Sequence, residues 1–92
     1  MTARVDLRLP SVLKDVTGRD HVRVRGRTVR DALEAAYEAL PRLRYHLALE
    51  SGDLRPHVLC VLNGEAVERD RLNETKLKDG DEIWIHQAIS GG

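Results

Sequence analysis

The chain has 92 residues, enough for one small domain with little room for a deep enzyme cleft. Its 15 basic and 15 acidic residues cancel, which removes the simplest electrostatic reason for binding nucleic acid or an anionic membrane. Cys60 is the only cysteine, so no internal disulfide can form, and because neither a signal sequence nor a membrane-spanning apolar run appears, we expect a cytoplasmic protein.

Two stretches near the start of the chain alternate apolar with charged residues. In residues 4–9 and 21–25 an apolar side chain recurs at every second position, which is the period of a half-buried strand. The residues between them, which include Gly18, form a loop that is long for a hairpin. We predict that the two strands pair across this loop.

A helix is predicted to begin at Thr28. Asp31 follows three residues later, which is the pattern of an N-cap whose acid favours the positive end of the helix dipole. Pro41 indicates a boundary, followed by a short second helix over residues 42–49. Apolar residues at helical spacing form a stripe on the first helix that must cover a sheet: Val29, Ala32, Leu33, Ala36, Tyr37 and Leu40.

A nearly continuous apolar run, residues 57–62, predicts the next strand. Such a strand is either covered on both faces or presents its outer face to a partner. Asn63 and Gly64 then favour a tight turn, because both tolerate positive φ, and lead into a short strand over residues 65–67.

The last third of the chain is predicted to contain one long loop and one strand. Residues 68–78 are polar, with Leu72 and Leu77 as expected anchors to the core. A turn at residues 79–80 leads to a final strand over residues 82–86.

This order of elements predicts an α+β fold of the β-grasp, ubiquitin-like class. A mixed sheet of four or five strands packs one face on the main helix, and the short second helix lies beside it. We expect residues 1–87 to form this domain and residues 88–92 to form a flexible tail.

Five short motifs follow one another in a fixed order. They are residues 9–10, 26–29, 63–65, 77–82 and the final pair Gly91 and Gly92. In these motifs, and over essentially its whole length, the sequence resembles the ubiquitin-like sulfur carrier proteins. That family includes the small subunit of molybdopterin synthase, the thiamine sulfur carrier and the carrier of cysteine biosynthesis.

The resemblance implies a co-substrate rather than an enzyme. It implies that an ATP-dependent activating enzyme of the ubiquitin-activating type adenylates the carboxylate of Gly92, and that a sulfur donor converts the adenylate to a thiocarboxylate. The sulfur then passes to an accepting synthase, such as the large subunit of molybdopterin synthase. The resemblance also implies that this chain binds no cofactor, since the partner enzyme consumes the ATP. The length and residues 41–49 look more like the molybdopterin or cysteine type than the shorter thiamine type. We therefore predict that the sulfur serves molybdopterin biosynthesis, with cysteine or thiamine biosynthesis as the alternative pathways.

Glycine at both final positions suits this chemistry on physical grounds. Attack on an activated acyl carbon needs open access, which residues without a Cβ provide. Glycine also lets a tail thread a narrow channel in geometries that other residues avoid. We therefore predict Gly92 as the acyl centre and Gly91 as the residue that gives access to it.

An apolar docking patch is predicted near the base of the tail. In the last strand, Trp84 alternates with two isoleucines that fill the core side, so it should lie on the sheet face that the helix leaves open. The predicted partner-binding residues are Trp84, Leu59, Val61, Ile89 and Ser90.

Two alternative functions stay open. A ubiquitin-like modifier would use the same activated tail to join a lysine, and a non-catalytic interaction module would not use the tail chemically.

Other features are given structural interpretations. Cys60 lies in an apolar run, which is typical of a small buried hydrophobe rather than a nucleophile. The four histidines show no metal-ligand spacing, so we predict no metal site. A concentration of arginines without interleaved aromatic residues favours a solvated face or a protein docking site over nucleic acid: Arg19, Arg23, Arg25, Arg27 and Arg30.

Overall fold

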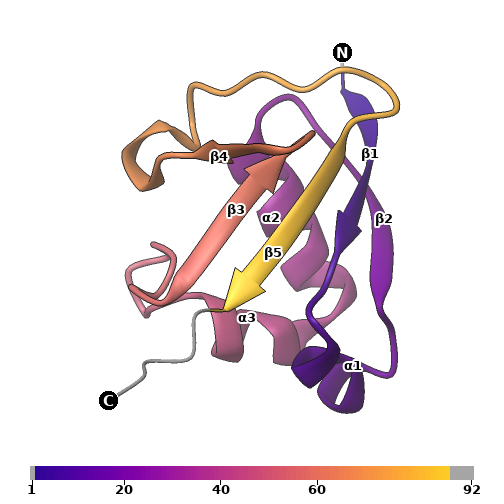
Figure 1. Ribbon diagram of the computed structural model, residues 1–92, viewed down its shortest axis with the longest axis vertical. Helices are drawn as coiled ribbons and strands as arrows, with labels where there is room; N and C mark the ends of the chain where they lie inside the picture. The colour runs from indigo at the N-terminus through magenta and orange to yellow at the C-terminus, as the bar shows by residue number, and fades with distance from the viewer. Residues whose placement is uncertain (1, 88–92) are drawn as a thin grey trace.

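Five strands form one mixed sheet in the order β2-β1-β5-β3-β4, with α2 packed across one face (Figure 1). The computed structural model describes residues 2–87. The strands are β1 (Ala3–Arg8), β2 (His21–Gly26), β3 (Val58–Leu62), β4 (Glu65–Val67) and β5 (Glu82–Gln87). Within residues 2–87 the helices are α1 (Ser11–Thr17), α2 (Val29–Ala39) and α3 (Pro41–Leu47), with a 3-10 turn η1 (Arg69–Arg71). The five-stranded sheet, α2 and α3 confirm the predicted layout.

The predicted hairpin is confirmed, but its connection is not a simple loop. Strands β1 and β2 pair antiparallel over their whole lengths. The segment between them contains α1, which the sequence pattern did not predict. This helix is only seven residues long, buries Leu13 alone and has no side-chain N-cap, so it carries no apolar stripe. Gly18 ends it in left-handed geometry, with φ of 77°, and donates its N–H to the Lys14 carbonyl at 2.7 Å.

The two predicted helix boundaries are confirmed. The Thr28 hydroxyl accepts a hydrogen bond of 3.2 Å from the Asp31 backbone N–H, which caps α2. Pro41 occupies the first turn of α3, where its missing N–H costs nothing. The apolar stripe of α2 faces the sheet and is buried from Val29 to Tyr37.

The core lies between α2 and the inner face of the sheet. Strand β1 runs parallel to β5, with Leu7 beside Ile83, and β5 runs antiparallel to β3, with Ile85 beside Cys60. All four of these side chains are buried. Leu72 and Leu77 are buried as well, so the predicted anchors of the long loop are confirmed.

The turn after β3 and the segment before it are both fixed locally. Asn63 and Gly64 have φ of 48° and 88°, as the predicted tight turn requires. Before β3, the Arg69 guanidinium donates to four backbone carbonyls over residues 54–58, at 2.6 to 3.3 Å. These bonds hold the chain where it enters β3.

Gly26 ends β2 against the first turn of α2. A Cβ at this position would lie 2.7 Å from the Ala32 backbone nitrogen and 3.0 Å from the Asp31 carbonyl carbon. We expect Gly26→Ala to lower the free energy of unfolding by about 1–3 kcal/mol, because backbone must move apart. The neighbouring exposed change Arg27→Ala should stay within about 0.5 kcal/mol. Urea denaturation measures both, and equal stability of the two variants would contradict this close contact.

Candidate functional site

The side of the sheet turned away from α2, which we call the outer face, carries the predicted docking residues. Trp84 on β5 lies directly beside Val61 on β3, and Leu59 lies beside His86. The exposed fractions of Trp84 and Leu59 are 42% and 46%, whereas Val61 is half-buried. The structure therefore brings these three together, and we call Leu59, Val61 and Trp84 the apolar patch.

Strand periodicity explains the patch. Ile83 and Ile85 are 0% and 1% exposed, so the residue between them must point to the opposite face. Of the two predicted possibilities for β3, the open outer face is the observed one, since Val58 and Cys60 are buried and Leu59 is not. The patch extends to the exposed residue Ala66, which pairs with Val61.

Polar groups fix the Trp84 indole. Its Nε1–H donates to the Glu82 carboxylate at 2.6 Å. The Arg8 guanidinium lies 5.7 Å from the ring centroid, within the range of a cation–π contact. The His86 ring stacks at 6.3 Å between centroids. These contacts hold the indole in one orientation, and its exposed part is available for contact with a partner.

Arg8 joins the patch to a small ionic network. Asp6, the next outward-facing residue of β1, lies 3.8 Å from the guanidinium of Arg8 and 3.8 Å from that of Arg23 on β2. Arg8 was not predicted as a site residue, because its place beside Trp84 depends on the parallel pairing of β1 and β5. Alternation in β1 could have placed it on the outer face, but not next to the indole.

The predicted tail residues lie outside the described part of the chain. These are Ile89, Ser90, Gly91 and Gly92. The last described strand, β5, ends at Gln87, which pairs with Val58. Because Leu59 pairs with His86, the apolar patch lies beside the last described residues of the chain.

Cys60 points into the core and away from the apolar patch. It is 1% exposed, and burial raises the pKa of its thiol to about 12. At neutral pH the group is therefore the protonated thiol, which is neither a nucleophile nor a metal ligand. The interpretation of Cys60 as a small hydrophobe is confirmed.

Residues 2–87 contain neither a metal-binding cluster nor a membrane-spanning helix. No group of three or more His, Cys, Asp or Glu side chains within that range is arranged to hold a metal ion. No described helix is long and apolar enough to cross a membrane.

Comparisons with known proteins agree with this fold. The model described as the ThiS family matches residues 7–92. The crystal structure of SAMP1 from Haloferax volcanii superposes with a TM-score of 0.84 at 31% identity, covering 98% of this chain and 100% of that one. A chain in the crystal structure of the Amycolatopsis orientalis BexX/CysO complex gives 0.82 at 27% identity, covering 96% and 99%. These similarities confirm the β-grasp class.

A curated relative matches over a shorter stretch. Ubiquitin-related modifier 1 of Laccaria bicolor is 39% identical over 49 residues, which are 53% of this chain. The matched part is 40% of that protein, so this chain spans less than half the length of the curated relative that it matches.

Proposed function

Because the chain belongs to the ThiS family of ubiquitin-like sulfur carriers, we propose that it carries sulfur as a thiocarboxylate on the carboxylate of Gly92. Residues 1–87 form the domain that partners recognise, and residues 88–92 form the tail that they process. The observation that carries this proposal is the family match, which runs through residue 92 and includes both glycines.

The chemistry takes place on the partner enzyme, and the chain supplies the reacting group. An oxygen of the Gly92 carboxylate attacks the α-phosphorus of ATP, so that pyrophosphate leaves and an acyl-adenylate forms. Hydrosulfide supplied by the sulfur donor then attacks the acyl carbon, AMP leaves and a proton is released. Because a free carboxylate is a poor electrophile, the adenylate is what makes the second step feasible.

The apolar patch is the surface through which partners recognise the domain that carries this tail. An exposed indole held rigidly beside two aliphatic side chains is the kind of anchor that dominates binding at protein interfaces. The patch spans β3 and the last strand before the tail, β5, so a partner that covers the patch also receives the tail. We assign it to the activating enzyme and to the sulfur-accepting synthase. The molybdopterin-type acceptor stays a prediction.

A second candidate function is supported by the names of two relatives. One relative is a ubiquitin-related modifier, and members of the SAMP1 group are called small archaeal modifier proteins. A modifier would use the same adenylate, but a lysine amine of a target protein would attack the acyl carbon in place of hydrosulfide.

Mass spectrometry separates the candidates after incubation with the activating enzyme, ATP, a sulfide source and a lysine-bearing acceptor protein. Exchange of one oxygen for sulfur at Gly92 supports the carrier. An isopeptide bond between Gly92 and a lysine supports the modifier. An unchanged chain in the presence of an active enzyme would contradict both and favour an interaction module.

A further inference from the structure

The structure divides the group of arginines between residues 19 and 30. Arg23 and Arg25 lie on the outer face of β2, whereas Arg30 lies on α2 and is paired with Glu34 at 3.1 Å. A different residue, Arg4 on β1, joins the first two on the outer face because it pairs directly with Arg25.

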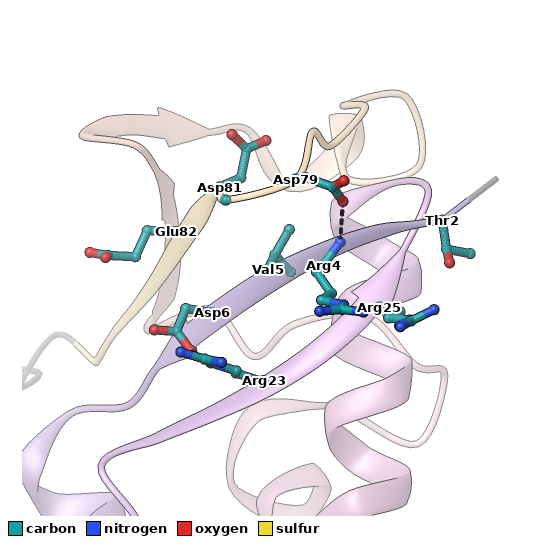
Figure 2. Close-up of a pocket in the computed structure, with 10 residues that line it drawn as sticks. Thr2, Arg4, Val5, Asp6, Arg23, Arg25, Asp79, Asp81 and Glu82 are labelled. Atoms are coloured by element: carbon teal, nitrogen blue, oxygen red, sulfur yellow. Dashed lines mark hydrogen bonds and ion pairs between the residues drawn. The ribbon is translucent and has the colours of Figure 1, made fainter.

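Arg4 and Arg25, which we call the arginine pair, stand opposite each other on neighbouring strands and are both exposed. Figure 2 shows the two side chains on the same side of β1 and β2, with Arg23 turned toward Asp6 instead. Like charges directly opposite in a sheet destabilise it. Within residues 2–87, neither Arg4 nor Arg25 has an ion pair.

The carboxylates that line the hollow beside the pair already have other partners. Asp6 lies 3.8 Å from both Arg8 and Arg23, and Glu82 accepts from the Trp84 indole. Asp79 accepts the Arg4 backbone N–H at 2.8 Å. The two oxygens of Asp81 accept from the Asn63 side chain at 2.9 Å and from the Lys78 backbone at 2.7 Å. With the arginine pair they line a hollow of about 520 Å³ (Figure 2). The positive charge of the pair is thus left available to a molecule outside the chain.

We propose that the arginine pair is a second docking point, which binds a carboxylate-bearing loop of the activating enzyme. This inference rests on the proposed carrier function. Guanidinium groups match carboxylates in a two-bond fork, and a loop with one or two acidic residues fits a hollow of this size. A long polyanion such as RNA fits poorly, because its phosphates would extend beyond the arginine pair and meet Asp79, Asp81 and Glu82 in the same hollow, whereas one carboxylate can contact the two guanidinium groups alone.

The arginine pair and the apolar patch are close enough for a single partner to contact both. Arg4 precedes Arg8, the neighbour of Trp84, by four residues of one strand, which is roughly 13 Å. An interface of ordinary size, roughly 800 Å² on each partner, covers both. The patch then supplies the apolar centre, and the pair supplies a charged rim that orients the approaching enzyme.

Arg25→Glu tests the proposal with one substitution. The new carboxylate faces Arg4 across the strands and pairs with it, so the free energy of unfolding should stay equal or rise. The kcat/KM for pyrophosphate release by the activating enzyme should fall about 10-fold at low salt, with kcat unchanged, because docking and not chemistry is affected. High salt should reduce the difference.

The control is Arg42→Glu, an exposed residue of α3 with the same change in charge. It should keep the wild-type kcat/KM. Equal losses in the two variants, or no loss in Arg25→Glu, would overturn the docking point, as would loss of binding to a single-stranded RNA probe without loss of kcat/KM. If Arg25→Glu fails to fold, Arg25→Gln serves instead. No pyrophosphate release with the wild-type chain would contradict the proposed function itself, and this inference with it.

Discussion

Deletion of Gly92 is expected to reduce thiocarboxylate formation by at least about 100-fold, because reacting groups displaced by as little as 1 Å lose that much rate. The deletion moves the terminal carboxylate back by one residue, about 3.5 Å. The shortened chain still ends in glycine, at Gly91. The loss of activity is therefore caused by the changed position of the carboxylate and not by an added side chain.

The comparison with Gly92→Ala sharpens this test. That variant keeps the length of the tail and adds one Cβ, so it should lose less activity than the deletion. Both changes leave residues 2–87 intact, and the free energy of unfolding should stay within about 0.5 kcal/mol. Formation of the thiocarboxylate at the wild-type rate by the shortened chain would exclude Gly92 as the acyl centre.

The second large effect is expected from the double variant Trp84→Ala with Leu59→Ser. Buried aromatic anchors contribute about 2 kcal/mol or more to an interface, which corresponds to roughly a 30-fold weaker Kd for the activating enzyme. The two side chains are 42% and 46% exposed, so their loss should leave the fold intact. Calorimetric titration gives the Kd, and circular dichroism gives the fold.

Tyr45→Ala is the matched control for this variant. Tyr45 is an exposed aromatic residue on α3, at 76%, and lies outside the sheet. Its truncation removes similar apolar area from the surface and should not change the Kd. Unchanged binding by the folded double variant, or equal weakening by Tyr45→Ala, would show that the apolar patch is not the docking surface.

Local patterns predicted most of the fold, because each has a short-range physical cause. Alternation in residues 4–9 and 82–86 fixed which side chains point inward, and the Thr28 cap fixed where α2 begins. The helix α1 was missed for a local reason as well. With one buried residue and no capping side chain, it differs little in pattern from a polar loop.

At the candidate site, the contacts that depend on long-range strand pairing could not be predicted from the sequence. Alternation was enough to place Trp84 and Leu59 on the outer face. The contact of Arg8 with Trp84 follows from the parallel pairing of β1 with β5. The register of that pairing cannot be predicted from either segment alone. The arginine pair depends in the same way on the register of β1 and β2, which the unrecognised α1 obscured.

The most direct test of the carrier function is the mass of the chain after reaction with its activating enzyme, ATP and sulfide. A carrier should show a shift equal to the replacement of one oxygen by one sulfur, confined to the peptide that ends at Gly92 and absent when ATP is omitted. An unshifted peptide under conditions in which the enzyme releases pyrophosphate from ATP would contradict the carrier function.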